Sequence, residues 1–511
     1  MMLRNELAGW AKPLSRALAA YAAVALISGC AVGPDFHSPA APVVTGYARS
    51  SLAAKTTSSG VSGGEEQRFV PDQQLSSRWW TLFESPPLNA LMEKALTASP
   101  TLVAAQAALR QAQELLYAQR GAFYPNVQAS FSPSRQRSSA TLAPPLNTDD
   151  LTYYLFTAQG TLTFVPDVFG GNRRQVESLI GLAEAQRFQL DAAYVTLTSS
   201  LAAAVIQEAS LRAQIAATHE LIDISAKSLA SMRRQFELGA VARLDVAAQE
   251  AALAQVQQTL PPLQKQLEQT RNLLAALSGR FPSDEPEEQF ELATLRLPQE
   301  LPVGLPSTLV AHRLDVRIAE AQLHAASAQV GVALASRLPQ FTIIGTAGGL
   351  STEFTRMFAN SNPFWSVVGN VAQTLFDGGT LRHRQRAAEA AFEQAGAQYR
   401  STVIAAFQNV ADALYALQAD AEALKAAVAA EQATKASLDL TLTAQQLGAI
   451  NYLAVLNAEQ AYGQTLLTCV QAQATRLSDT VALFQALGGG WWSRPDGAAA
   501  HPAGRPSAGE E

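Results

Sequence analysis

Residues 172–238 read NRRQVESLIGLAEAQRFQLDAAYVTLTSSLAAAVIQEASLRAQIAATHELIDISAKSLASMRRQFEL and decide the fold. The stretch contains no proline, and Gly181 is its only glycine. Its apolar residues recur at spacings of three, four and seven, which is typical of a coiled coil. At a rise of 1.5 Å per residue, a continuous helix over this range would be roughly 100 Å long. The apolar stripe consists of Leu190, Ala193, Leu197, Leu201, Ala204, Leu211, Ile215, Ile222, Leu229, Met232 and Phe236.

The chain repeats this plan about 209 residues later, which indicates an internal duplication. The sequence FELGA (236–240) recurs as QLGA (446–449), and FGGNR (169–173) recurs as DGGT (377–380). Because both landmarks keep their order and nearly their spacing, a second long helix is predicted at about 381–447.

Two segments of alternating hydrophobicity precede each long helix. Strands are predicted at about 126–134 and 152–165 in the first half, and at about 340–350 and 364–376 in the second. Each is close to the length that a tilted strand needs to cross a bilayer. Soluble hairpins that pack on helices remain an alternative interpretation of the strands taken alone.

Aromatic residues and the absence of long apolar runs favour a crossing by strands. Tyr153, Tyr154 and Trp365 suit the aromatic belt at a membrane interface. No run of about 18 uncharged apolar residues follows Cys30, so no membrane-spanning helix is predicted there. The loop at 140–149 would then lie outside the cell.

The N-terminus is typical of an exported lipoprotein. Arg4, Lys12 and Arg16 flank an uncharged run that is too short to span a bilayer. The run ends at Ile27-Ser28-Gly29-Cys30, which has the form of a bacterial lipobox. We predict that residues 1–29 are a signal peptide and that Cys30 carries a covalent lipid. Ala31, rather than Asp, after the cysteine favours the outer membrane.

The residues that follow resemble the start of a known family. The sequence AVGPDF (31–36), with Pro39 shortly after, is similar to the mature N-terminus of outer membrane factor lipoproteins of the TolC, OprM and NodT type. The resemblance implies a mainly α, TolC-like fold with membrane β-strands and a helical tunnel through the periplasm. It also implies a passive exit duct of a tripartite efflux system, with a periplasmic adaptor and an inner membrane RND-type pump as partners.

Four strands per chain cannot form a closed membrane sheet alone. Open sheet edges in hydrocarbon leave backbone groups without partners, so several chains must join their strands. The resemblance supplies the number: a homotrimer with one twelve-stranded barrel.

The two helix turns are candidate docking sites for the adaptor. A glycine in each turn permits the left-handed conformation that closes a helical hairpin. By resemblance, the candidate docking residues are Leu238, Gly239, Leu244, Leu447, Gly448 and Leu453.

The family also tends to close the periplasmic end with acidic residues just after the turn. Arg243 and Asp245 are therefore candidate gate residues. Ala454 and Asn457 stand where the second half would carry acids, and this departure weakens the inference.

The remaining sequence sets provisional domain limits: a lipidated segment at 30–70, a first repeat at 71–279, a linker or equatorial segment at 280–306, a second repeat at 307–487 and a disordered tail at 488–511. Pro261 and Pro262 predict a kink or break in the helix that follows the first turn. The corresponding position near Val470 has no proline.

Composition and motifs argue against other functions. A net charge of −6 gives no basic stripe for nucleic acid. Glu320 and His324 have helical spacing but lack a third metal ligand. Gly170-Gly171 and Gly378-Gly379 match no nucleotide-binding pattern and better suit a bend between strand and helix. Neither a catalytic motif nor a cofactor, other than the lipid on Cys30, is predicted.

The sequence leaves two alternatives open. One is a periplasmic coiled-coil scaffold lipoprotein without a pore, and the other is the exit duct of a type I protein secretion system. Drugs, metal ions, oligosaccharides and polypeptides all remain possible substrates of a channel.

Overall fold

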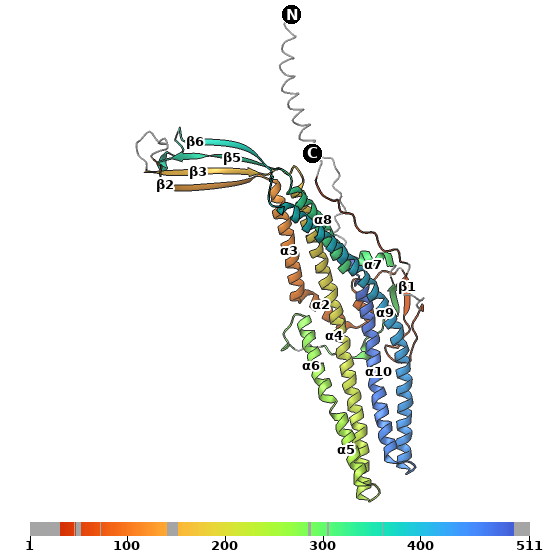
Figure 1. The fold of residues 1–511 in the computed structure, drawn as a ribbon. Helices are drawn as coiled ribbons and strands as arrows, with labels where there is room; N and C mark the ends of the chain where they lie inside the picture. Colours follow the sequence, from red (N-terminus) through yellow and green to blue (C-terminus); the bar gives the residue numbers. More distant parts are fainter. Residues whose placement is uncertain are drawn as a thin grey trace. The chain divides into compact units, whose positions relative to one another are not determined.

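The computed structural model describes residues 31–44, 46–47, 53–71, 73–139, 152–284, 288–303, 306–359 and 361–494. They form two compact units, and each takes residues from both sequence repeats (Figure 1). Of the described residues, the strand unit takes those within 31–39, 108–186 and 319–399, and the helical unit takes those within 40–107, 187–318 and 400–494. The predicted signal peptide, Cys30 and the predicted outer loop at 140–149 lie outside the described residues.

Long helices dominate the chain. In chain order the elements are β1 Arg68–Pro71, the 3-10 helix η1 Trp79–Phe83, α2 Pro86–Ala98, α3 Pro100–Arg120, η2 Gly121–Phe123, β2 Asn126–Arg137, β3 Thr152–Phe164, α4 Gly171–Glu237, α5 Arg243–Gln257, α6 Leu260–Leu277, η3 Leu292–Thr294, β4 Glu300–Val303, α7 Pro306–His312, α8 Leu314–Ala335, β5 Gln340–Ser351, η4 Phe354–Arg356, β6 Pro363–Ala372, α9 Thr380–Gln446, α10 Tyr452–Ala486 and η5 Trp491–Ser493. The helices α4 and α9 are each 67 residues long.

The strand unit contains one four-stranded sheet. Its order is β2-β3-β5-β6, and all neighbours are antiparallel. The four strands lie side by side as an extended ribbon in Figure 1. Among the described residues, β2 pairs only with β3 and β6 only with β5, so the sheet has two open edges.

The strand register places apolar residues on one face of this sheet. Val127 lies opposite Leu162, which lies opposite Gly345, which lies opposite Val367. The next row of the same face consists of Ala129, Gly160, Ala347 and Trp365. Because side chains alternate along a strand, the rows between carry the other face. One of them consists of Gln128, Thr161, Thr346 and Ser366.

The helical unit has an aromatic core. Trp79, Trp80 and Phe83 of η1 are at most 1% exposed, and Trp79 packs on Phe484 of α10 with ring centroids 5.5 Å apart. Residues of the predicted 280–306 linker add to this core, since Phe290, Leu292, Leu295, Leu297 and Leu301 are also buried. The short parallel pair β1 and β4 belongs to the same unit.

The predicted break at Pro261 and Pro262 is confirmed. Helix α5 ends at Gln257 and α6 begins at Leu260, directly before the two prolines. The corresponding helix α10 runs for 35 residues without interruption. A proline in a helix interior removes a hydrogen-bond donor and clashes with the preceding turn, which explains the difference.

The prediction of a disordered tail is wrong for residues 488–494. Three glycines, Gly488 to Gly490, adopt positive φ and lead into η5. There Trp491 is buried against Phe188, with ring centroids 5.7 Å apart, and its Nε1 donates to the His312 carbonyl at 2.7 Å. Burial of the indole outweighs the flexibility of the glycines. Residues 495–511 lie outside the described part.

Helix α4 alone, among the described helices, meets the length and composition of a membrane span. The sequence predicts no membrane-spanning helix after Cys30. However, 56% of the apolar window is buried inside the protein, which is typical of a core helix.

Candidate functional site

The two helix turns of the helical unit have the same backbone geometry. Gly239 has φ +75° and Gly448 has φ +73°. The Ala240 amide donates to the Gln235 carbonyl and the Ala449 amide to the Ala444 carbonyl, each at 2.9 Å. This bond spans five residues and closes the end of each long helix in the manner of a Schellman motif.

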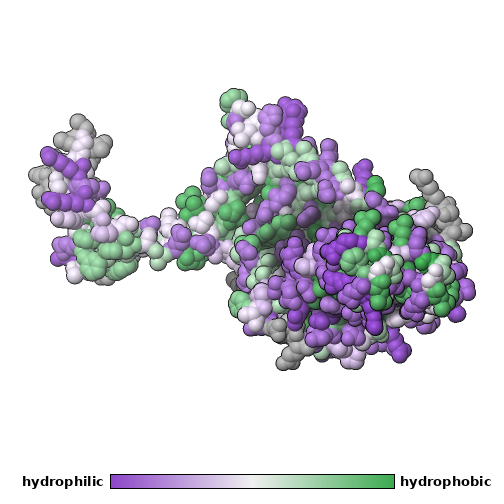
Figure 2. Space-filling view, turned by 90° about the horizontal axis from the view of Figure 1, so that it is seen from below, coloured by the Kyte–Doolittle hydropathy of each residue, from purple (hydrophilic) through white to green (hydrophobic). Residues whose placement is uncertain are grey.

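The predicted docking leucines surround these turns and are exposed. Leu238, Leu244, Leu447 and Leu453 are between 59% and 80% exposed. Figure 2, seen from below, shows hydrophobic patches among hydrophilic residues on the face that the helix turns present. Each turn thus brings two leucines and a glycine together. A contiguous exposed apolar patch is typical of a contact surface.

The candidate gate residues have local roles in the isolated chain. The Asp245 carboxylate accepts a hydrogen bond from the Ala242 amide at 3.1 Å and so caps the start of α5. Arg243 is exposed at the first position of the same helix. In the second hairpin, Asn451 caps α10 by accepting from the Ala454 amide at 3.2 Å. The gate itself stays a prediction.

A buried polar network that the sequence analysis missed joins three helices near the turns. Glu459 of α10 accepts hydrogen bonds from Ser225 and Ser228 of α4 and from Gln249 of α5. The Tyr452 hydroxyl donates to the other end of the Gln249 amide. Burial, together with nearby Glu459 and Asp245, raises the pKa of Tyr452 to about 12. The partners are up to 234 residues apart in sequence, so no local pattern reveals them.

A second buried network surrounds Arg476 of α10, which has no exposed surface. Its guanidinium donates to the Gly63 carbonyl at 3.2 Å, to Thr56 at 3.1 Å and to Gln67 at 3.0 Å. These bonds attach the segment before β1 to α10. Asp479, one turn further along α10, shares a hydrogen bond with Asp420 of α9. Burial, followed by this hydrogen bond and the Asp420 charge, raises the pKa of Asp479 to about 8.

The strand unit makes the predicted bends between strands and long helices. Asp167 accepts from the Asn172 and Arg173 amides at 2.9 and 2.8 Å. Asp377 does the same for the Gly379 and Leu381 amides at 2.8 and 2.7 Å. These bonds, above all that from Leu381, lower the pKa of Asp377. Because the two aspartates take helix N-terminal amides, these amides are not free for a phosphate.

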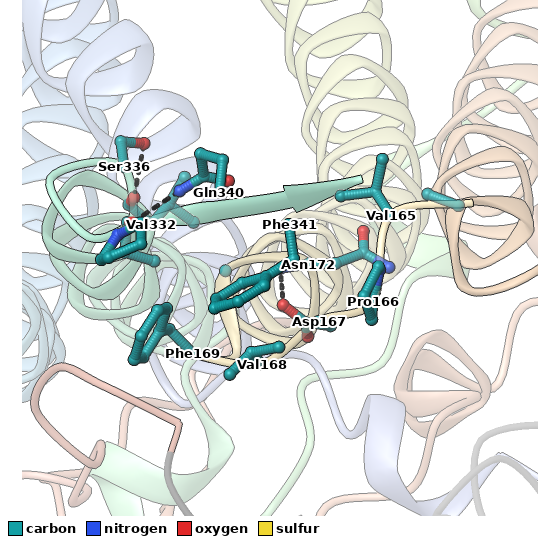
Figure 3. A pocket seen from close by; sticks show the side chains of 14 residues that line it. Val165, Pro166, Asp167, Val168, Phe169, Asn172, Val332, Ser336, Gln340 and Phe341 are labelled. Atoms are coloured by element: carbon teal, nitrogen blue, oxygen red, sulfur yellow. Dashed lines mark hydrogen bonds between the residues drawn. The ribbon is translucent and has the colours of Figure 1, made fainter. Parts of the chain in front are cut away.

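Figure 3 shows the first bend from close by. Asp167 points back to the backbone of Asn172, and a pocket of about 260 Å³ lies beside it. The side chains of Phe169 and Phe341 help to line this pocket.

The residues that follow Cys30 dock beside this bend. The Val32 amide donates to the Phe169 carbonyl at 3.1 Å. Arg174 of α4 donates to the Val32 carbonyl at 3.1 Å and to Asp35 at 2.7 Å. Gly33 lies so close to Gly331 of α8 that a side chain on Gly33 would collide with the α8 backbone. We call residues 32–38 the N-terminal strap.

Glu320 and His324, whose helical spacing resembles that of metal ligands, contact the strap. Glu320 accepts a hydrogen bond from Ser38. His324 stacks on Phe36 with ring centroids 4.4 Å apart, and its Nε2 lies 3.1 Å from a Glu177 carboxylate oxygen. The described residues contain no group of three His, Cys, Asp or Glu side chains suited to a metal ion.

Comparison with known proteins shows that both sequence repeats match one protein family. The family model described as "Outer membrane efflux protein" matches residues 91–280 and 305–489, that is, most of both repeats. This chain belongs to the outer membrane efflux protein family. The resemblance seen in residues 31–36 is therefore confirmed.

Curated relatives of this outer membrane efflux protein are similar over nearly their whole length. The chain is 31% identical to the pyoverdine export outer membrane protein OpmQ of Pseudomonas putida, over 83% of this chain and 89% of that protein. It is 28% identical to the toluene efflux pump outer membrane protein TtgF of another Pseudomonas putida strain, over 92% and 97%.

Solved structures agree with the fold. The outer membrane channel OprN superposes with a TM-score of 0.79 at 27% identity, covering 90% of this chain and all of that one. VceC of Vibrio cholerae gives a TM-score of 0.74 at 26% identity, covering 82% of this chain and all of that one.

The outer membrane efflux protein is thus a channel component of an efflux system in the outer membrane, with a TolC-like fold. Its relatives are channel proteins. The alternative of a scaffold without a pore is excluded by this membership.

Proposed function

We propose that this outer membrane efflux protein acts as a homotrimer whose sheets join edge to edge into a twelve-stranded barrel. The open edges at β2 and β6 and the predominantly apolar face that includes Trp365 support the proposal. Edge strands in a bilayer must pair, because unpaired backbone groups in hydrocarbon cost several kcal/mol each. Pairing β6 of one copy with β2 of the next satisfies both edges.

Cys30 carries the lipid anchor in this proposal. The docked strap supports it, because Ala31 lies against Gly170, a few residues after β3 ends at Phe164. A lipid on the preceding residue would then lie near the end of the strands, where the membrane surface should be.

The exposed turns are the docking surface for a periplasmic adaptor, which connects the channel to an inner membrane RND-type pump. Leu238, Gly239 and Leu244 form one contact patch, and Leu447, Gly448 and Leu453 form the other. Arg243 and Asp245 contribute to the closed periplasmic end. The channel is a passive duct that performs no chemistry and needs no cofactor.

Small apolar or drug-like molecules are the proposed cargo. The relatives named above export toluene and pyoverdine. We favour small molecules over polypeptides for this reason, and the pump would set the selectivity.

The trimer is tested by light scattering of protein extracted in mild detergent, together with single-channel recording in planar bilayers. We expect trimers with a low conductance. A stable monomer without pore activity would refute the proposal. A Cys30→Ser variant should lose labelling by radioactive palmitate and still form trimers.

The docking surface is tested by Leu238→Asp with Leu447→Asp in cells that depend on this channel for solvent or drug tolerance. Tolerance should fall to the level of a deletion while the amount of trimer stays unchanged. Leu273→Asp, at an exposed leucine of α6, is the matched control and should keep tolerance. Full tolerance in the double variant would show that docking occurs elsewhere.

A further inference from the structure

A pocket of about 320 Å³ lies in the helical unit between α4, α5, α9 and α10. Its inner wall is apolar, with Leu221, Ala252, Leu438 and Gly463 all buried. Its rim carries neutral polar side chains that are exposed: Gln255, Thr259, Gln460 and Gln464. An apolar pocket with a few polar groups is the usual form of a small-molecule site.

One acidic side chain lines this pocket. Glu459 is only 6% exposed and receives hydrogen bonds from two serines and Gln249. Within the described part of the chain, no Lys, Arg or His lies within ion-pair distance of it. A buried carboxylate is costly without a partner of opposite charge, even when it is hydrogen-bonded.

The helix break adds negative potential at the same place. Gln255, Val256 and Thr259, which line the pocket, lie at the C-terminal end of α5 and at the break itself. Pro261 and Pro262 have no N–H group, so the carbonyls of Gln257 and Gln258 lack their helical donors. The C-terminal end of a helix carries a partial negative charge that favours a cation.

We propose that this pocket binds an organic cation with an apolar body and a single protonated amine. The apolar wall would take the body, and Glu459 would pair with the ammonium group. The volume is at the lower end of the range for small-molecule pockets, which favours a compact ligand over a peptide. The site goes beyond the proposed duct function, because a passive duct needs no ligand between its hairpins.

Two probes of equal shape test the proposal on the full-length trimer in detergent. We expect 4-phenylbutylamine to bind by calorimetry roughly tenfold or more tightly than the neutral 4-phenylbutanol, because only the amine forms a charge-assisted bond. Equal affinities, or no binding of either probe, would overturn the proposal.

Variants connect the preference to the pocket. Glu459→Gln keeps one acceptor oxygen for the serines, and the serine that faces the new amide nitrogen can turn its hydroxyl to accept. The variant should bring the amine down to the affinity of the alcohol. Glu250→Gln removes an exposed carboxylate of α5 that pairs with Arg233, and it should leave the amine preference unchanged. An unchanged preference in Glu459→Gln would show that the cation binds elsewhere.

A variant that fills the pocket tests the site without changing Glu459 or its hydrogen-bond partners. Ala252→Leu places a larger side chain at a buried position of the lining and should abolish binding of both probes. The trimer content of each variant, measured by light scattering, reports folding. Amine binding that persists in a folded Ala252→Leu trimer would refute the site.

Discussion

The first and second helical hairpins share a turn but differ in the helix that returns from it. Both turns use a glycine near φ +75° and the same closing hydrogen bond. The first hairpin returns through α5 and α6 with a break at two prolines, whereas the second returns through the continuous α10. The geometry of a turn depends on a few local residues, while the continuity of a helix can be lost at one position.

The two hairpins have also become complementary. The first supplies Ser225, Ser228 and Gln249, and the second supplies the buried Glu459 that accepts from all three. The acid pair Asp420 and Asp479 occurs in the second half only, since Leu211 and Thr270 stand at the corresponding positions. Polar groups of the two halves thus hold one another, and the acid pair distinguishes the second half from the first.

The largest expected effect comes from a break in the second hairpin. Val470 is the counterpart of Pro261 and packs against the core of the helical unit. Val470→Pro should cost about 3 kcal/mol or more in unfolding free energy, because it removes a helical hydrogen bond and clashes with the previous turn. Thermal unfolding followed by circular dichroism measures it, and Val470→Ala is the control. Equal stability of the two variants would show that α10 tolerates the break.

The acid pair should make stability depend on pH. The pKa of Asp479 is about 8 in the folded protein, against about 3.9 for an unfolded aspartate. The folded state therefore keeps a proton that the unfolded state has lost, and unfolding free energy should fall as pH rises from about 4 to about 8. Asp479→Asn should flatten this slope in thermal scans, while Asp439→Asn, exposed on α9, should not. A slope unaffected by Asp479→Asn would contradict the pairing.

The turns should respond alike despite the different return helices. Gly239→Ala and Gly448→Ala should each cost about 1 kcal/mol, because an L side chain disfavours positive φ. No atoms lie within 4 Å of the added methyl at either position, so only backbone strain contributes. The loss should be smaller for asparagine than for alanine. Thermal unfolding of the alanine and asparagine variants at Gly239 and Gly448 measures these losses. A different loss of stability at the two turns would contradict their equivalence.

The smallest effects are expected at the helix caps. Asn451→Ala and Asp245→Ala should each cost about 0.5–1 kcal/mol, because each removes an acceptor for a helix N-terminal amide. Single-channel recording separates capping from gating. If Asp245 also closes the channel, Asp245→Ala should raise the open probability and Asn451→Ala should not. The same open probability in both variants would show that Asp245 acts only as a helix cap.

Sequence periodicity located the long helices and strands closely. The helix predicted at 172–238 is Gly171–Glu237, and the strand predicted at 152–165 is Thr152–Phe164. Periodicity is a local property, and helices and strands of this length are mostly set by it. The last predicted strand, 364–376, ends instead at Ala372.

Contacts between distant residues could not be predicted in this way. Arg174 binds the strap about 140 residues before it, and Arg476 binds residues more than 400 positions away. A single charged residue in a helix pattern gives no sign of whether it faces water or a buried partner. The prediction of a disordered tail was wrong at Trp491 for the same reason. This residue packs on Phe188 and donates a hydrogen bond to the His312 carbonyl, and both partners are far away in the sequence.

The register of the sheet limits how these strands can change in length. Val127, Leu162, Gly345 and Val367 share one face because each side chain alternates with its neighbours. Loss or gain of one residue within a strand would turn every later side chain to the opposite face. Tolerated insertions and deletions in these segments should therefore come in pairs, and single-residue changes should be confined to the loops between them.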